Sequence, residues 1–414
     1  MRVLLSTIGS RGDVQPLVAL ALQLRALDQQ VGLCIPPDFR DWIAGLGLPV
    51  IPIGPEVRNA GRARRAATTA APSPEQRRQL AEATVATQFE TITAAAQHCD
   101  VIVAATALQI AAPSVAEKMG IPYIFAGYCP IVLPSPHHAP PPLPPLPGET
   151  PPSATAANSE LWARSAERFN DLFGAALNAR RAAIGLTPVS DVRSHMFTNR
   201  PWLAADPTLA PWPDPTDRNV IQTGAWIVAD DRPLSRDVET FLDAGEPPVY
   251  FGFGSVHASA EAGEAMSQTA RALGRRAIVS RGWADLSLRD DRADCLVIGE
   301  ENLQALFKRV AAVVHHGGAG TTTIAALAGA SQVVVPHVYD QHYFARRIHD
   351  LGIGTAHAPG TPTIESLTSA LERTLQPEVA ARAQSIATEM RRDGAQVAAE
   401  RILKESGFRN QADT

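Results

Sequence analysis

Short apolar runs alternate with longer stretches of helical apolar spacing along the first half of the chain. Residues 3–7 have the pattern of a buried strand, residues 8–13 that of a loop, and residues 17–27 that of a helix whose first turn accepts Pro16. This order predicts a parallel, doubly wound sheet, whose ligands bind beyond the carboxyl ends of the strands. Further strands of this sheet are expected at residues 31–35, 49–53, 100–105, 122–125 and 202–206.

A second series with the same rhythm begins after a proline-rich boundary at residues 207–215. A helix is expected at residues 261–273, and residues 380–405 are mainly helical in pattern. The expected strands lie at residues 248–253, 277–280, 295–298, 311–315 and 332–335. The pattern therefore predicts an α/β protein with two Rossmann-like domains facing each other across a cleft.

The domain limits follow from these boundaries. We expect one domain at residues 1–215, a second at 216–395, and a C-terminal helix at 396–414 that crosses back to the first. At 414 residues the chain is long enough for two to three domains.

A proline-rich segment at residues 129–154 interrupts the first domain. Proline removes backbone donors and fixes φ, so this segment is neither a helix nor an inner strand. One interpretation is a polyproline ligand for the aromatic groove of another protein. We favour a stiff loop over the mouth of the first domain, because the segment directly follows a strand. Within it, His137 and His138 are expected to be solvated or to pack the loop rather than to bind metal.

Composition excludes several classes of function. The hydrophobic fraction of 45% and charged fraction of 19% describe a folded globular protein. A net charge of -5 and 6% aromatic residues argue against a nucleic-acid partner. No stretch reaches the length of a membrane span, and the apolar run at residues 3–8 is too short for a signal peptide.

The cysteines bear on the compartment. They are widely spaced and form no C-x-x-C pair, as expected of thiols in a reducing compartment rather than of disulfides or a zinc site. We therefore expect a cytoplasmic protein. The cysteines are Cys34, Cys99, Cys129 and Cys295.

The stretch at residues 313–323, V-V-H-H-G-G-A-G-T-T-T, has the chemistry of an anion site. A strand, a glycine turn and a helix start bring backbone N–H groups close to a ligand. Thr321, Thr322 and Thr323 can cap the helix or donate hydroxyls to a phosphate, and His316 can donate to a phosphate oxygen. The alternative is an ordinary turn that needs small residues.

Three loops of the second half should meet that stretch at the carboxyl ends of their strands. They supply small residues, backbone donors and an Asp-Gln pair, which suit a ligand with phosphates at one end and hydroxyls at the other. These loops are residues 252–256, 299–302 and 336–341. No G-x-G-x-x-G follows the first strand and no G-x-x-x-x-G-K-[ST] occurs, which argues against hydride enzymes and P-loop NTPases.

These motifs support a resemblance to a known family. H-H-G-G-A-G-T-T followed by P-x-x-x-D-Q resembles the donor signature of the GT-B, family 1 glycosyltransferases. The opening G-S-R-G-D-V-Q-P-L-V-A-L, together with Q-T-G-A-W and S-R-G-W-A-D-L, is similar to the bacterial glycosyltransferases that act on vancomycin-type glycopeptides. The resemblance covers nearly the whole chain, apart from the proline-rich segment and residues 58–74.

The resemblance implies a set of donor-binding residues. Asp340 and Gln341 match the pair that holds the sugar hydroxyls, and Trp283 and Ile298 match loop positions that line the nucleotide base. The residues implied near the phosphates are Ser10, Arg11, Ser255, His316, Gly318, Ala319, Gly320 and Thr321.

Asp13 is the implied catalytic base. It stands three residues before Pro16, where many relatives have histidine and the glycopeptide branch has aspartate. A carboxylate there can remove the acceptor hydroxyl proton, provided that burial brings its pKa toward the working pH. Alternatively Asp13 caps the following helix, and one side chain can do both.

The resemblance implies an inverting, metal-independent transferase of antibiotic biosynthesis. It would move a sugar from a TDP- or UDP-sugar to a hydroxyl of an apolar aglycone: an antibiotic, a polyketide, a steroid or a lipid. No cofactor is expected, since the nucleotide-sugar is a co-substrate. Ile324 stands where plant relatives have a ribose-binding Glu, which leans slightly toward a TDP-sugar. The alternatives are a silent nucleotide-sugar-binding auxiliary protein and a nucleotide-sugar 2-epimerase.

Overall fold

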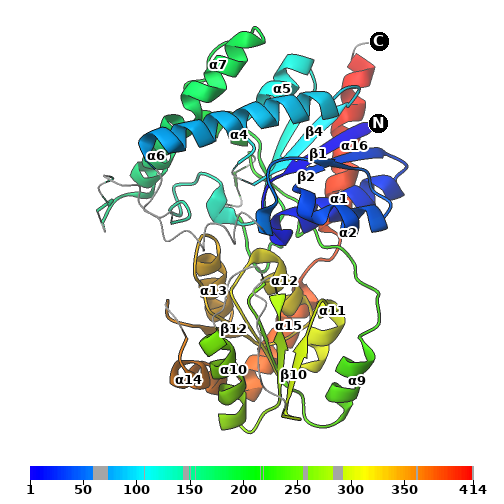
Figure 1. Cartoon of the computed structure of the whole chain (residues 1–414), viewed down its shortest axis with the longest axis vertical. Coiled ribbons are helices and arrows are strands. Elements are labelled where there is room, and N and C mark those ends of the chain that lie inside the picture. The colour runs from blue at the N-terminus through cyan, green and yellow to red at the C-terminus, as the bar shows by residue number, and fades with distance from the viewer. Residues whose placement is uncertain are drawn as a thin grey trace. The chain divides into compact units, whose positions relative to one another are not determined.

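The computed structural model of the chain consists of two compact units (Figure 1). Unit 1 comprises residues 1–205, 212–228 and 392–414, and unit 2 comprises residues 206–211 and 229–391. The structure describes residues 1–58, 73–106, 108–142, 149, 151–153, 155–214, 216–217, 219–254, 260–282, 292–359 and 362–412. In this part of the chain, no helix is long and apolar enough to cross a membrane.

Unit 1 is built on a sheet of seven described strands, all paired in parallel, in the order β3-β2-β1-β4-β5-β6-β7. The strands are β1 (Arg2–Thr7), β2 (Gln30–Ile35), β3 (Val50–Pro52), β4 (Val101–Ala105), β5 (Tyr123–Gly127), β6 (Trp202–Leu203) and β7 (Ile221–Gln222). Chain order reverses direction between β1 and β4. That point of a doubly wound sheet is where ligands bind, beyond the carboxyl ends.

The helices of unit 1 include one that returns from the far end of the chain. α16 (red in Figure 1) packs against α1. The helical segments are α1 (Arg11–Ala26), η1 (Pro37–Phe39), α2 (Arg40–Gly45), α4 (Pro74–Ala95), α5 (Ala112–Met119), η2 (Pro130–Val132), α6 (Asn158–Phe169), the π-helix η3 (Asn170–Gly174), α7 (Ala175–Ala183), α8 (Val192–Phe197) and α16 (Gly394–Ala412).

Unit 2 repeats the architecture with six described strands, again all parallel, in the order β10-β9-β8-β11-β12-β13. The strands are β8 (Val249–Gly252), β9 (Ala277–Ser280), β10 (Cys295–Ile298), β11 (Ala312–His315), β12 (Gln332–Val334) and β13 (Gly354–Ala356). The helical segments are α9 (Arg236–Asp243), α10 (Ala260–Ala272), α11 (Leu303–Leu306), η5 (Phe307–Arg309), α12 (Ala319–Leu327), α13 (Gln341–Asp350), α14 (Ile364–Thr374) and α15 (Pro377–Glu389). Chain order reverses here between β8 and β11.

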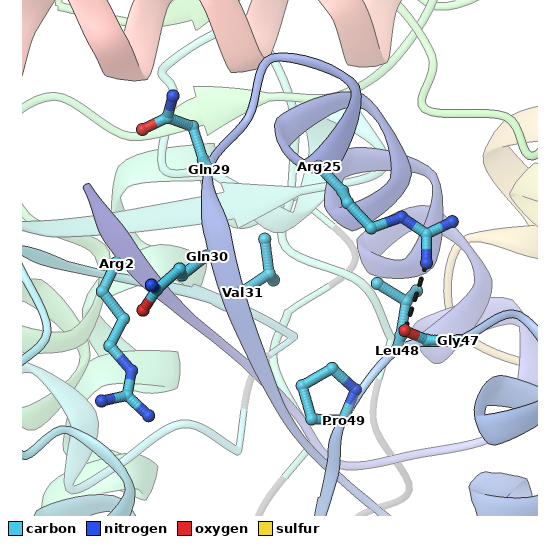
Figure 2. Close-up of a pocket in the computed structure, with 8 residues that line it drawn as sticks. All are labelled: Arg2, Arg25, Gln29, Gln30, Val31, Gly47, Leu48 and Pro49. Carbon is cyan, nitrogen blue, oxygen red and sulfur yellow. Dashed lines mark hydrogen bonds between the residues drawn. The ribbon is translucent and has the colours of Figure 1, made fainter.

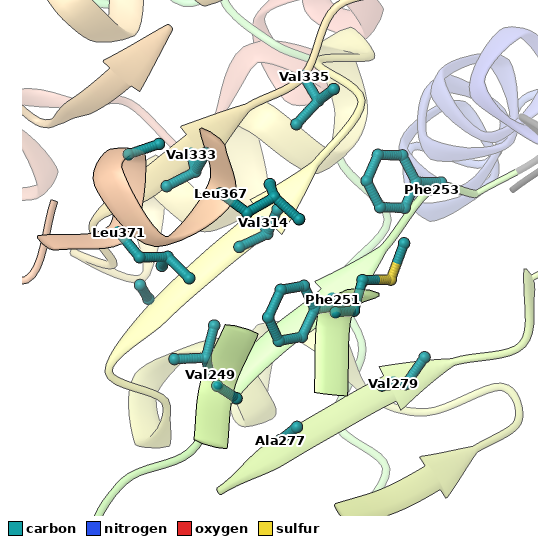
Figure 3. Packing of buried hydrophobic residues seen from close by; sticks show 14 residues of the cluster. Val249, Phe251, Phe253, Ala277, Val279, Val314, Val333, Val335, Leu367 and Leu371 are labelled. Atoms are coloured by element: carbon teal, nitrogen blue, oxygen red, sulfur yellow. The ribbon is translucent and has the colours of Figure 1, made fainter. Parts of the chain in front are cut away.

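The inner strands of unit 2, β9, β8, β11 and β12, are buried on both faces, as parallel strands covered by helices must be. Figure 3 shows one face, where Phe251 of β8 and Val314 of β11 pack against Leu367 of α14. On the other face, Tyr250 of β8 packs in a cluster that includes Phe307. Alternate residues of one strand therefore serve two cores, which explains why the strands appear in the sequence as continuous apolar runs.

Several predicted boundaries are corrected by the structure. α1 begins at Arg11, so Pro16 lies inside the helix and not in its first turn. The helical stretch expected at 380–405 is two helices, α15 and α16. The strand predicted at 202–206 is only Trp202–Leu203, and β7 and β13 were not predicted at all.

The described part of the proline-rich segment is anchored by aromatic packing. The ring of His138 meets Trp162 and Trp212 edge to face, at centroid distances of 6.0 and 5.8 Å. Trp162 Nε1 donates to the carbonyl oxygen of His138 over 2.8 Å. His138 therefore packs the loop, which is one of the two environments that the sequence analysis expected for it.

Candidate functional site

The glycine turn between β11 and α12 is shaped by close contacts. Gly317 has φ +90°, and a Cβ there would lie 2.6 Å from Val334 Cγ1 and 3.1 Å from the carbonyl oxygen of Gln341. A Cβ on Gly318 would lie 2.6 Å from Nε2 of His316. Gly317 therefore requires glycine, whereas a side chain at Gly318 would displace the His316 ring, and the two glycines let the chain turn directly from the strand into the helix.

The N-terminus of α12 has no side-chain cap. Gly318 is the N-cap residue, so the first backbone N–H groups of the helix, starting at Ala319 and Gly320, receive no acceptor from it. Such an N-terminus carries partial positive charge and is suited to an anion.

The three threonines lie inside α12 rather than capping it, because the helix begins earlier than the sequence suggested. Thr322 Oγ1 donates to the carbonyl oxygen of Gly318 over 2.9 Å, and Thr323 Oγ1 donates to that of Ala319 over 2.7 Å. The expectation that these two cap the helix or donate to a phosphate is corrected. Thr321 lies in the first turn and is half-buried.

His316 stands at the turn as a neutral imidazole. Burial lowers its pKa to about 4, with a smaller contribution from His337. Its Nδ1 is buried and has no hydrogen-bond partner among the described residues. A buried nitrogen without a partner is costly, and a ligand oxygen at this place would satisfy it.

Loops from neighbouring strands converge on this turn. A Cβ on Gly254, after β8, would lie 3.1 Å from His316 Cε1, and a Cβ on Gly282, after β9, would lie 2.3 Å from the carbonyl oxygen of Gly254. Gly317 in turn meets the backbone of Gln341 at the start of α13. The convergence lies at the β8/β11 reversal of the sheet, where a ligand crevice is expected.

The predicted loop at residues 299–302 bonds to a different part of unit 2. Asn302 caps α11 through the N–H of Ala305. Its Nδ2 donates to the carbonyl oxygens of Asp230 and Arg232 over 2.8 and 2.6 Å.

The Asp-Gln pair begins α13. Gln341 is buried, and its Oε1 accepts from the N–H groups of His337 and Val338 over 2.8 and 3.1 Å. The carboxamide oxygen therefore holds the preceding loop, which leaves the Nε2 group as the donor. Asp340 is the half-exposed N-cap of α13. Their role toward a sugar stays a prediction.

Of the two residues predicted to line the nucleotide base, the structure describes only Ile298. Ile298 ends β10 and is buried in a cluster with Ile278 and Leu306. Ser255 and Trp283 lie outside the described residues.

In unit 1, Asp13 lies in the first turn of α1, directly after β1. Its Oδ2 accepts from the backbone N–H of Ser10 over 2.6 Å and from Ser10 Oγ over 3.1 Å. Asp13 thus helps to hold the start of the helix, as the capping interpretation expects. Burial outweighs these two bonds and raises the pKa of Asp13 to about 6.

The residues around Asp13 are also tightly packed. A Cβ on Gly9 would lie 2.2 Å from Asp13 Oδ2, which requires glycine there. Tyr128 donates its hydroxyl to the backbone oxygen of Asp13 over 3.1 Å. Thr106, after β4, donates to the backbone oxygen of Ile8 over 3.2 Å. The loops after β1 and β4 are therefore joined beside Asp13, at the reversal point of this sheet.

Arg11, implied to lie near the phosphates, stacks within unit 1. Its guanidinium carbon lies 4.6 Å from the centroid of the Trp42 ring, at cation–π distance.

Two residues of these sites were not singled out from the sequence. Tyr128 follows β5 directly, so the strand-end rule that selected the other loops could have found it. His315 is the first histidine of the H-H pair. The sequence carries no signal for its role, because every residue of β11 is buried and the apolar pattern has no polar face.

The described residues contain no group of three or more His, Cys, Asp or Glu side chains that could hold a metal. A cavity of about 320 Å³ in unit 1 lies at the amino ends of β1 and β2, lined by Arg2, Arg25 and Gln30 (Figure 2). A larger cleft of about 730 Å³ is lined by charged side chains of α4 and α6. Neither is lined by a predicted site residue, and the first lies at the wrong edge of the sheet for a ligand site.

Comparisons with known proteins decide the family. Residues 3–133 match the glycosyltransferase family 28 N-terminal domain, and residues 296–402 match the erythromycin biosynthesis protein CIII-like C-terminal domain. Glycosyltransferase GtfE of Amycolatopsis orientalis is 51% identical over 98% of both chains. The vancomycin aglycone glucosyltransferase of the same organism is 49% identical over 97% of both chains. The chain belongs to the vancomycin-type glycosyltransferases.

A third member from that organism extends the range of the family. A dTDP-epi-vancosaminyltransferase is 44% identical over 93% of both chains. The protein is thus a glycosyltransferase, and the resemblance inferred from its motifs is confirmed. The silent auxiliary protein and the epimerase are not supported.

The fold agrees with this assignment. The glycosyltransferase VinC, solved in complex with dTDP, superimposes with a TM-score of 0.67 at 19% identity and covers 99% of this chain and 100% of its own. The predicted GT-B fold, with two parallel-sheet α/β domains, is confirmed.

Proposed function

We propose that this glycosyltransferase moves a sugar from a nucleoside diphosphate to a hydroxyl group of an apolar natural-product aglycone, with inversion and without a metal ion. In this proposal the second predicted domain, residues 216–395, most of which is unit 2, binds the nucleotide-sugar. Unit 1 binds the aglycone and provides the base. We infer a cytoplasmic enzyme from the spacing of its cysteines.

The observation that carries the donor assignment is the uncapped N-terminus of α12 beside His316. The diphosphate of the donor would accept from the N–H groups of Ala319, Gly320 and Thr321, and from the His316 side chain. These groups would neutralise the charge that develops on the leaving diphosphate, which is the role that a metal ion has in other transferases. Ser255, Gly318 and the Asp340–Gln341 pair would complete the donor site, with Trp283 and Ile298 at the base.

Asp13 is the proposed base. Both bonds from Ser10 go to its Oδ2, so Oδ1 is the oxygen we assign to the proton. Oδ1 removes the proton of the acceptor hydroxyl as that oxygen attacks the anomeric carbon. The bond from that carbon to the diphosphate breaks on the opposite side, which inverts the configuration. Ser10 and Arg11 would lie on the phosphate side of this reaction.

The names of the relatives reduce the range of candidate acceptors and donors. One acts on an aglycone of vancomycin and another is named for a dTDP-sugar, which supports a glycopeptide-like acceptor and a TDP-sugar donor. Ile324 favours the same donor, since its half-buried aliphatic side chain packs on the core and cannot bond to a ribose hydroxyl.

Calorimetric titration with TDP, UDP and GDP tests the donor assignment. We expect one of them, TDP first, to bind the wild type and to bind His316→Ala at least tenfold more weakly. A transfer assay with glycopeptide aglycones should give the same rate with and without EDTA. If none of the three nucleotides binds, the donor assignment is wrong. Loss of transfer in EDTA would overturn the metal-free mechanism.

A further inference from the structure

His315, the neighbour of His316, makes two hydrogen bonds that point in different directions. It is the last residue of β11 and is fully buried. Its Nε2 lies 2.9 Å from Oε1 of Gln332 on the adjacent strand β12. Its Nδ1 accepts from the backbone N–H of Gly317 over 3.1 Å. The ring therefore links the inner strand β12 to the glycine turn.

These two bonds fix the tautomer of the ring. A backbone N–H only donates, so Nδ1 must carry the lone pair that receives the bond from Gly317. The proton of the neutral ring then lies on Nε2 and is donated to the carboxamide oxygen of Gln332. Burial supports the neutral form, because it lowers the pKa of His315 to about 3. Gln332 is itself fully buried, and its Nε2 has no partner among the described residues.

The glycine turn that His315 holds is the one that starts α12. Gly317 fits against Val334 of β12 and the backbone of Gln341 with no room for a side chain. The bond to Nδ1 fixes the remaining freedom of its peptide group. Gly318 follows as the N-cap, so the direction of the first N–H groups of α12 depends on this peptide.

We propose that His315 is a positioning residue for the transfer reaction. Held in one tautomer by Gln332, it fixes the Gly317 peptide, and through it the α12 amides and the His316 side chain, in the geometry that receives the donor diphosphate. Donors that need no rearrangement at the moment of reaction stabilise developing charge most effectively. The inference rests on the proposed donor site and adds a residue that does not itself touch the substrate.

Three variants test the two bonds. His315→Phe keeps a buried ring and removes both bonds. His315→Asn replaces Nδ1 by a side-chain oxygen, which can accept the N–H two residues on, as in an Asx turn. Gln332→Leu removes the acceptor that selects the tautomer. Thr374→Val is the matched control, because it removes a buried bond to Thr355 in the same unit, over 2.8 Å, away from the turn.

We expect His315→Phe to bind TDP at least tenfold more weakly, with a higher KM for the sugar donor and an unchanged KM for the aglycone. His315→Asn should recover most of that loss. The ¹⁵N shifts of His315 should report an Nε2–H ring in the wild type and a mixture of tautomers in Gln332→Leu. Thr374→Val should lower Tm and leave TDP affinity as in the wild type.

The outcomes separate this inference from the proposed function. If the wild type binds TDP and His315→Phe binds it equally well, the positioning role is wrong and the donor site stands. Equal loss of TDP affinity in Thr374→Val would show a general effect of stability and would also overturn the role. If the wild type binds none of the three nucleotides, the donor site fails, and the positioning role fails with it.

Discussion

Asp13 combines a structural and a chemical property in one carboxylate. One oxygen, Oδ2, is bound by Ser10 at the start of α1, and that arrangement orients the side chain. Burial nevertheless raises its pKa to about 6, well above that of an ordinary aspartate. A general base works best when its pKa is near the working pH, so the same local packing that holds the helix start also favours proton removal.

The rate of transfer should therefore depend on the ionisation of Asp13. The base is active when ionised, so kcat/KM should be level above pH 6 and fall about tenfold per pH unit below it. Asp13→Asn should lower kcat/KM by about 100- to 10,000-fold and remove this limb. In Ser10→Ala the loss of a bond that lowers the pKa should move the limb to higher pH. Full activity of Asp13→Asn would exclude the base role.

His316 should take up a proton when the nucleotide binds. Its pKa in the free enzyme is about 4, and a diphosphate next to the ring would raise it, because negative charge stabilises the imidazolium. Between the two pKa values the complex holds a proton that the free enzyme lacks, so TDP affinity should rise as pH falls through that interval. Calorimetry in two buffers of different ionisation enthalpy measures this uptake. The proton uptake should vanish in His316→Ala and persist in His337→Ala. Equal uptake by the wild type and both variants would show that a group other than His316 takes up the proton.

At the scale of elements, α5, α7 and α8 are held together by one buried arginine. Arg181 of α7 donates to Glu117 of α5 over 2.7 and 3.2 Å and to Ser114 Oγ over 2.8 Å. Ser114 Oγ also lies 2.9 Å from Nε2 of His195 on α8. Burial first, and then the arginine, lower the pKa of His195 to about 4, so the ring is neutral. Arg181 Nη1, which only donates, also lies 3.3 Å from Nε2, so this nitrogen accepts the hydrogen bond of the Ser114 hydroxyl.

Removing this arginine should destabilise unit 1. Arg181 is buried while Glu117 is partly exposed, so Arg181→Met should lower the free energy of unfolding by about 2 kcal/mol, mainly through the hydrogen-bond partners that it leaves unsatisfied. Arg180→Met, at the exposed neighbouring position of the same helix, should change it by less than about 0.5 kcal/mol. Urea denaturation of both variants measures the difference. Indistinguishable midpoints would show that the helices are held by their apolar contacts alone.

The sequence could predict most of the elements but not their ends. Buried parallel strands such as β1, β8 and β9 are continuous apolar runs, and their predicted ranges match the structure within one residue. α1 and α12 begin before their apolar spacing does, because Ser10 and Gly318 act as N-caps and the first turns contain glycine and polar residues. β7 and β13 have two and three residues at sheet edges, too short for a periodic pattern.

The residues of the candidate site could likewise be predicted only where a local sequence pattern marks them. Glycine clusters after strands mark turns whose backbone must come close to something, so the loop of His316 and the Asp13 loop could be predicted without coordinates. His315 and Gln332 could not, since their contact joins two strands that are seventeen positions apart in the chain. Gln341 was expected to face the sugar, while its oxygen also holds the 337–338 backbone, a contact that only the turn geometry creates.

At the scale of the whole molecule, two sheets of the same topology each carry one candidate site at their reversal point. The chain passes between the units more than once, since residues 206–211 belong to unit 2 and residues 212–228 to unit 1. α16 then returns to α1, and Gly394 fits so closely against Gly224 that a Cβ would lie 2.4 Å from its carbonyl carbon. Each unit thus has its own core and its own candidate site, while the chain that crosses between them joins the two units covalently.

That division predicts that binding and turnover can be lost separately. A ligand that binds only the folded protein stabilises it by about 2.7 kcal/mol at 100 times its dissociation constant, so TDP should raise Tm. Asp13→Asn changes unit 1 alone and should keep the full TDP-induced rise in Tm while losing transfer. His316→Ala changes unit 2 and should lose both. Thermal denaturation with and without TDP, run beside the transfer assay on the same three proteins, measures the two properties. If Asp13→Asn lost the TDP effect as well, Asp13 would belong to the donor site, and the assignment of the base to a separate acceptor unit would have to be withdrawn.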